Sequence, residues 1–269
     1  MTQEVAVLGC GAFVPGFDGL AGWASGKASA DHDAPKGEIV PLRQRRRASP
    51  LSKALADAYA EALGETNLEA SSVASVFGSA IGEASTMIGL LDQMWSDSTM
   101  LSPMRFATSV HNAASGMISI ATDNRGMTTA IGADYDTPAM ALLEGIGLVL
   151  GRGEPVIVCC GDEAPPENLV PDGAGWGLMT AAIALCPSNE ASASSPRLSD
   201  LALASANSSP PETSTETPAT SATLEAIGQN PNIGLLDLAV AIRSGMEGVV
   251  RLDRGAGRGF SIRLHASMA

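Results

Sequence analysis

Basic residues are scarce in this sequence. It has 16 Lys and Arg against 29 Asp and Glu, which gives a formal net charge of −13 at pH 7. Nucleic acids and anionic lipids are bound through basic faces, so the charge balance argues against both kinds of partner. The sequence also lacks a stretch of about 18 uncharged apolar residues, and we therefore expect no membrane span.

Aromatic residues make up only 4% of the 269 residues, so the core must be built from Ala, Leu, Ile, Val and Met. The first residues, 1–13, have no basic segment and no cleavage site, and they do not resemble a signal peptide. The four cysteines have no metal-ligand spacing (Cys10, Cys159, Cys160 and Cys186). We expect a cytoplasmic protein with free thiols and without disulfides.

Short apolar runs alternate with amphipathic segments, a pattern that indicates an α/β layered fold. Strands are expected over 4–9, 73–78, 128–131, 156–160, 179–185, 248–253 and 259–264. Helices are expected over 50–63, 84–95, 113–124, 139–150 and 233–244. Ser49 and Pro50 are typical of a helix start, the Gly-rich stretch 15–37 is expected as loop, and Gly255 and Gly257 predict a hairpin.

Residues 187–222 differ in composition from the rest of the chain. They are rich in Ser, Thr, Ala, Pro and Glu, and such a tract buries too little apolar surface to offset its ordering entropy. We expect a mobile excursion here. It would separate a main domain, 1–186, from a helix and hairpin, 223–269, that complete the domain.

A segment suited to a nucleophile carries none. Within residues 103–121, a turn of small residues precedes an apolar helical run (Ala113, Ala114, Ser115 and Gly116). In many acyl-transfer enzymes such a turn holds a Cys or Ser at a helix N-terminus, where backbone N–H groups and the helix dipole stabilise negative charge. In this chain the positions at its tip are alanines.

These residues resemble those of a known family. The motif runs Pro103-x-x-Phe106-x-x-Ser109-Val110-His111-Asn112-Ala113, followed by Ser115-Gly116. It is supported by Arg45–Arg47, by Phe77-Gly78-Ser79, and by the strand 156–160 that leads into Gly161-Asp162-Glu163. The chain resembles short β-ketoacyl synthase-like proteins of the thiolase superfamily, as found in aryl-polyene and other type II fatty-acid-like pathways. The match covers roughly residues 1–185.

The resemblance implies a thiolase-like αβα-layered fold, truncated relative to a full ketosynthase. It also implies dimerisation and an acyl chain carried by an acyl carrier protein. In related pairs of ketosynthase and chain-length factor, one subunit lacks the nucleophile and shapes the acyl tunnel. A ketosynthase would have its Cys at Ala113 or Ala114, and neither alanine can form an acyl thioester.

Other residues of this segment have two interpretations each. Ser115 is a nucleophile if His111 is its base, or it caps the helix. His111 is a base or oxyanion donor, or a buried histidine bonded to backbone. Asn112 either fixes the turn or faces a ligand. The remaining histidines, His32 and His265, do not complete a Cys–His–His triad.

Three further features of the sequence could mark a functional site. Cys159 and Cys160 point to opposite faces of a strand, so at most one could face a pocket. The adjacent residues Asp162 and Glu163 form either a carboxylate pair at a ligand site or a charged exit from the strand. Gly9-Cys10-Gly11 starts like a dinucleotide motif, but Val14 stands where the third glycine belongs. We expect neither a nucleotide nor another cofactor, and no metal.

Arg43, Arg45, Arg46 and Arg47 form the main basic cluster of an acidic chain. They either contact an acidic carrier protein or are simply a solvated segment before a helix.

Three functions remain open. The leading one is a non-catalytic, chain-length-factor-like subunit that pairs with an active ketosynthase, or with itself when that partner is absent. The second is an acyltransferase that uses Ser115 with His111, or one of the cysteines. The third is a stand-alone acyl-binding module.

Overall fold

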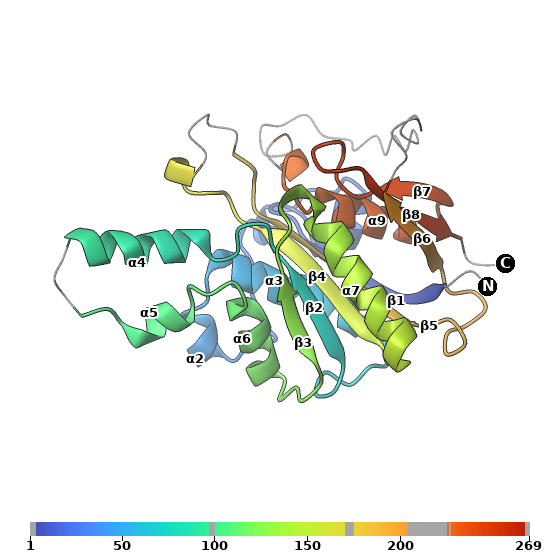
Figure 1. Ribbon diagram of the computed structural model, residues 1–269, viewed down its shortest axis with the longest axis horizontal. Helices are drawn as coiled ribbons and strands as arrows, with labels where there is room; N and C mark the ends of the chain where they lie inside the picture. Colours follow the sequence, from blue (N-terminus) through green and yellow to red (C-terminus); the bar gives the residue numbers. More distant parts are fainter. Residues whose placement is uncertain (1–3, 97–99, 170–174, 204–224, 226, 267–269) are drawn as a thin grey trace.

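The structure is a computed structural model that describes residues 4–96, 100–169, 175–203, 225 and 227–266. Its centre is a mixed sheet with the strand order β3-β2-β4-β5-β1-β6-β8-β7 (Figure 1). The strands are β1 (Val5–Phe13), β2 (Ala74–Gly78), β3 (Thr128–Ile131), β4 (Val156–Asp162), β5 (Met179–Pro187), β6 (Arg197–Leu203), β7 (Gly248–Arg251) and β8 (Phe260–His265).

Strands β3, β2 and β4 run parallel, and the other neighbouring strands pair antiparallel. The three parallel strands therefore end at the same edge of the sheet, where Gly78, Ile131 and Asp162 are their last residues. The connections that leave this edge form the candidate site described below.

Helices cover both faces of the sheet, which confirms the expected αβα layers (Figure 1). One face packs against α3, and the other packs against α7 and α9. The helices are α1 (Gly19–Ala24), α2 (Leu42–Arg45), α3 (Pro50–Gly64), α4 (Ala84–Ser96), α5 (Pro103–Ala107), α6 (Ala113–Ala121), α7 (Thr137–Arg152) and α9 (Ile233–Arg243). In Figure 1, α4 and α5 extend away from the sheet.

The sequence of α3 explains its start and its place in the fold. The Ser49 hydroxyl accepts a hydrogen bond from the Ser52 N–H at 2.8 Å, and Pro50 is the first helical residue, as predicted. The helix lies so close to β1 that a Cβ at Gly9 or Gly11 would come within 2.6 or 2.3 Å of an α3 carbonyl oxygen. These two glycines thus serve close packing of a strand against a helix.

Most of the predicted elements are present, including the hairpin of β7 and β8. The stretch 15–37, expected as loop, contains α1, whose Leu20 and Trp23 are buried. Helices α2 and α5 were also not predicted. Among the described residues, no helix is long and apolar enough to cross a membrane.

The expected excursion over 187–222 is wrong for residues 197–203, which form β6. This strand pairs with β1 and β8, and its Leu198 is buried in the core. A strand with one apolar face can join a sheet even in a polar tract, because its solvent side tolerates polar side chains. Residues 204–222 lie outside the described residues.

Candidate functional site

Asp162, the last residue of β4, is the centre of a buried polar cluster at the edge where the parallel strands end. Its carboxylate accepts hydrogen bonds from the Ser79 hydroxyl at 2.5 Å, the Ala80 N–H at 2.7 Å and the Ile81 N–H at 3.1 Å. A fourth bond comes from the Asn232 side-chain amide, also at 2.5 Å. The carboxylate thereby ties the loop after β2 to the N-terminal end of α9.

Burial dominates the electrostatics of this cluster. It raises the pKa of Asp162 to about 6, although the four donors act in the opposite direction. Burial also raises the pKa of Glu163 and of Glu83, which follows the loop after β2. Asp162 and Glu163 do lie where β4 ends, as the strand-exit interpretation expected, but both side chains are buried.

The small-residue turn at 113–116 does not have the strand-to-helix geometry of a nucleophile turn. It follows α5 and a short loop, with no strand before it. Helix α6 begins at Ala113, so Ser115 lies in its first turn, and its hydroxyl donates to the Asn112 carbonyl oxygen at 3.0 Å. The prediction that Ser115 caps the helix is wrong, since Asn112 holds the cap position.

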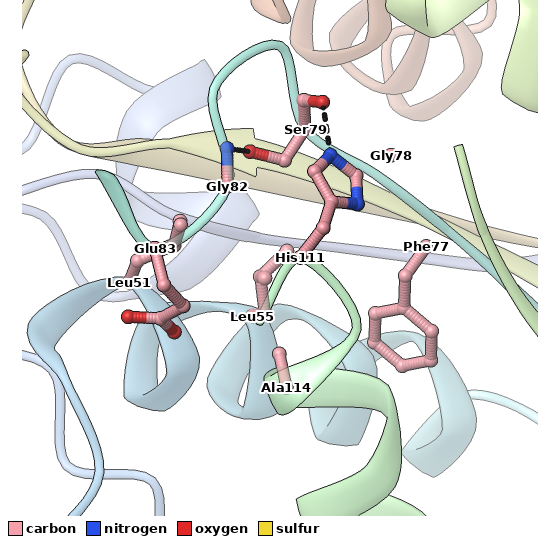
Figure 2. A pocket seen from close by; sticks show the side chains of 9 residues that line it. All are labelled: Leu51, Leu55, Phe77, Gly78, Ser79, Gly82, Glu83, His111 and Ala114. Carbon is pink, nitrogen blue, oxygen red and sulfur yellow. Dashed lines mark hydrogen bonds between the residues drawn. The ribbon is translucent and has the colours of Figure 1, made fainter. Parts of the chain in front are cut away.

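His111 is bonded to backbone, as one interpretation expected, but it is exposed and not buried. Its Nε2 lies 2.9 Å from the Ser79 carbonyl oxygen (Figure 2). A Cβ at Gly82 would come within 2.8 Å of the imidazole ring, so this glycine makes room for the histidine. Beside the ring, Ala114 and Glu83 line a cavity of about 10 Å³. That volume is about the size of one water molecule and is too small for an acyl chain.

A sharper strand-to-helix turn lies elsewhere, after β3. Residues 132–136 connect β3 to α7, and Asp134 within them has φ of 52°. A strained residue at such a turn is the usual position of a nucleophile in α/β enzymes. Asp134 is exposed, and its carbonyl oxygen accepts a 2.6 Å hydrogen bond from the Thr137 hydroxyl. Sequence reasoning missed this turn, although a predicted strand followed at once by Gly132 was a signal for it.

The next carboxylate in this turn binds a distant loop. Asp136 accepts hydrogen bonds from the Arg258 N–H at 2.9 Å and from its Nε at 2.6 Å. The loop between β7 and β8 is therefore held against the start of α7. Tyr135 makes an edge-to-face contact with Trp176, whose indole N–H donates to the Glu163 carbonyl oxygen. These contacts hold the turn against the segments that carry Arg258 and Trp176.

All four cysteines are buried and free, and burial raises the pKa of each thiol. Cys159 and Cys160 lie in the core clusters on opposite faces of the sheet, which confirms the prediction for this pair. A buried thiol in apolar surroundings is a poor nucleophile. Among the described residues, no three His, Cys, Asp or Glu side chains form a group that could hold a metal ion.

The predicted basic cluster lies on and just after α2. Arg43, Arg46 and Arg47 are exposed and Arg45 is half-buried. None of the four makes an ion pair with a carboxylate of the described residues. These guanidinium groups are free to contact a partner.

Large apolar side chains are exposed on the neighbouring helices α4, α5 and α6. Trp95 is 96% exposed on α4, Phe106 is 62% exposed on α5, and Ile120 is 70% exposed on α6. Leu91 and Met94 add to the surface on α4. Large apolar side chains that are exposed to this degree are typical of an interaction site.

The αβα layers and the strand-to-helix turn after β3 define a thiolase-like protein. The family model for the N-terminal domain of β-ketoacyl synthases matches residues 21–232, and the chain belongs to this family. A search of curated proteins finds no match.

Solved structures of similar fold include complexes of ketosynthases. The chain is similar to a ketosynthase (ApeO) in complex with its chain length factor (ApeC) from Xenorhabdus doucetiae, with TM-score 0.67, 17% identity and coverage of 98% of this chain and 99% of that one. It is similar to the ishigamide ketosynthase/chain length factor, with TM-score 0.66, 15% identity and 100% of both chains covered. A complex of an acyl-carrier protein with its ketosynthase, AntDE:AntF, matches with TM-score 0.72, 13% identity and full coverage of both. These likenesses confirm the thiolase-like fold.

Proposed function

We propose that this chain is a non-catalytic ketosynthase-like subunit of the chain-length-factor type. It pairs with an active β-ketoacyl synthase in the cytoplasm and helps to bound the acyl tunnel. The observation that carries the proposal is the lack of a cysteine at either turn. Ala113 and Ala114 occupy one turn, and Asp134 occupies the strained position of the other. No thiol is available there to form an acyl thioester.

The exposed apolar surface of α4, α5 and α6 supports pairing. A side chain as large as Trp95, almost fully exposed, is costly to leave in water and favours burial by a partner. Two of the similar structures are complexes of a ketosynthase with a chain length factor, and they favour the same kind of partner here. We expect a large, mainly apolar interface on this side.

The free guanidinium groups of the Arg43–Arg47 cluster support contact with an acyl carrier protein. An acidic carrier would be repelled by most of a chain with a net charge of −13 and attracted to this cluster. One similar structure contains an acyl-carrier protein bound to its ketosynthase.

The geometry disfavours the acyltransferase alternative. The Ser115 hydroxyl donates to the Asn112 carbonyl oxygen, whereas the His111 ring is bonded to the Ser79 carbonyl oxygen. Each group therefore has its own backbone partner. A serine nucleophile needs its hydroxyl directed to its base.

Two measurements test the proposal. Intact mass after incubation with acyl- and malonyl-carrier substrates should reveal no covalent adduct and no condensation product from the chain alone. Light scattering of the chain mixed with an active β-ketoacyl synthase from the same organism should show a heterodimer. An acyl adduct on Ser115, or a monomer in both conditions at micromolar concentration, contradicts the proposal.

A further inference from the structure

Helix α4 has little packing of its own along most of its length. Of its residues only Ala84 and Leu90 are buried, and its main packing partner among the helices and strands is α5. Leu91, Met94 and Trp95 are exposed near its C-terminal end. Both helices extend away from the sheet (Figure 1). The position of α4 therefore depends on the contacts at its N-terminal end.

Glu83, the residue before α4, joins this helix to the start of α3. Its Oε1 accepts hydrogen bonds from the Ser49 hydroxyl at 2.7 Å and from the Ser52 hydroxyl at 2.6 Å. Its main-chain carbonyl oxygen accepts a hydrogen bond from the Met87 N–H at 2.9 Å. The Glu83 side chain lies beside Leu51 of α3 (Figure 2). One residue thus begins α4 and fixes it to α3.

Glu163, the residue after β4, is the second attachment of α4. Its carboxylate accepts hydrogen bonds from the hydroxyl and from the N–H of Ser85, in the first turn of the helix. Its Oε1 atom is buried and has no hydrogen-bond partner in the described part of the chain. Burial raises the pKa of Glu163, and burial together with the nearby charge of Glu163 raises the pKa of Glu83.

No cation compensates the two carboxylates. Neither forms an ion pair within the described residues. Two other titratable groups face this region: Asp162 precedes Glu163, and His111 lines the same cavity as Glu83 but is bonded through Nε2 to the Ser79 carbonyl oxygen. The cavity of about 10 Å³ has room for about one water molecule, so it offers an ionised Glu83 little hydration.

We propose that α4 is a hinged arm whose attachment is controlled by protonation of Glu83 and Glu163. While either carboxyl group is protonated, the first turn of α4 stays against α3 and the end of β4. Ionisation of both puts two like charges into one buried region, and the turn then opens so that water reaches them. The protons pass to the solvent. Gly82, with φ of 60°, precedes Glu83 and is the residue at which the chain turns.

The direction of the pH effect follows from proton linkage. In the attached state the pKa of each carboxyl group lies above the ordinary value of 4.5, and in the open state water restores that ordinary value. The open state therefore binds fewer protons, and a rise in pH favours it. Attachment is strongest below about pH 4.5 and weakens as the pH rises through the raised pKa values.

Hydrogen exchange of the full chain, read by mass spectrometry, tests the hinge. The protection factors of amides in residues 87–92, which take account of the intrinsic pH dependence of exchange, should fall at least about threefold between pH 5 and 7.5. Glu163→Gln keeps the shape of a protonated carboxyl group and should hold the protection at its pH 5 value. Glu167→Gln, at an exposed position, is the matched control and should show the wild-type fall.

Two further variants guard this test. Glu83→Gln should also hold the protection, and it replaces Glu163→Gln if that variant unfolds. Asp162→Asn removes the neighbouring buried carboxyl group and should leave the fall in place. Constant protection in the wild type overturns the proposal. A fall that the folded glutamine variants retain also overturns it, and so does a fall that Asp162→Asn abolishes, which would assign the effect to Asp162.

The hinge is a property of the chain alone and goes beyond the proposed function. If the chain pairs with a ketosynthase but the protection of α4 is constant with pH, the subunit proposal stands and the hinge proposal is wrong. If the protection falls with the expected variant pattern but no pair forms, the hinge proposal stands and the subunit proposal is wrong.

Discussion

Replacing Asp162 by Asn tests the electrostatics of the cluster at the end of β4. The side chain is fully buried and accepts four hydrogen bonds, from Ser79, Ala80, Ile81 and Asn232. Asparagine has nearly the same shape, but its NH₂ group must face donors that the carboxylate accepted. We therefore expect Asp162→Asn to be less stable than the wild type by about 1–3 kcal/mol at neutral pH.

The pH dependence of that difference is more informative than its size. Burial raises the pKa of Asp162 from 3.8 to about 6, a shift worth about 3 kcal/mol. Because the folded pKa is raised, the stabilising contribution is complete below the unfolded pKa and is lost as the pH rises through about 6. Between pH 5 and 7.5 the wild type should lose about 1 kcal/mol that Asp162→Asn, which cannot ionise, does not lose.

Urea denaturation at several pH values from 5 to 7.5 measures this loss. The lower limit stays above the sequence pI of about 4.5, where precipitation is favoured. Asp92→Asn, at an exposed position on α4, is the control and should leave the difference constant with pH. A constant difference for Asp162→Asn would refute the reasoning. A constant difference would mean that the four donors offset burial, because a carboxylate whose pKa is not raised is already ionised in both states above pH 5.

Three other predictions concern packing, charge and the Ser/Thr/Pro tract. Ala114→Leu adds a large side chain beside a cavity of about 10 Å³ and should cost about 1–3 kcal/mol, seen as a lower melting temperature, whereas Gly147→Leu, whose site is open, should leave it nearly unchanged. Replacing all four arginines of the Arg43–Arg47 cluster by Gln should weaken binding of an acidic carrier protein and flatten its salt dependence; an unchanged salt dependence would exclude the cluster as the contact. Limited proteolysis should cut first within 205–222, and strong amide-exchange protection across those residues would show the prediction to be wrong.

Periodicity and composition predicted the layers of the fold because burial fixes the sequence pattern there. The runs that became β4 and β5 are buried on both faces, so nearly every residue in them is apolar or small. Helix α3 combined a buried apolar stripe with a recognisable start at Ser49 and Pro50. Such signals are local, and they can be recognised without knowing which distant residues pack against these segments.

The candidate site was harder to predict because its contacts are distant in sequence. The loop 79–81 and Asn232 meet Asp162 only in the folded chain, so a charged strand exit and a buried cluster look alike in the sequence. Small residues were equally ambiguous. At 113–114 they pack at the start of α6, and the strained turn is at Asp134, where an aspartate tolerates a positive φ without glycine.

Polar groups buried around the two turns hold the fold together there. The Asp162 carboxylate and the Asp136–Arg258 ion pair are satisfied within the chain, so they stabilise the fold whether or not chemistry takes place there. The buried acceptors Gln44 Oε1, Glu163 Oε1 and Asn232 Oδ1 have no hydrogen-bond partner in the described chain. The guanidinium of Arg47 and the exposed apolar side chains of α4, α5 and α6 are open to a partner. Arg47 and the apolar side chains lie on or next to α2, α4, α5 and α6, which are toward the left of Figure 1. Selection for binding would keep such groups and selection for stability alone would remove them, so the function of this chain is best sought in what covers that side.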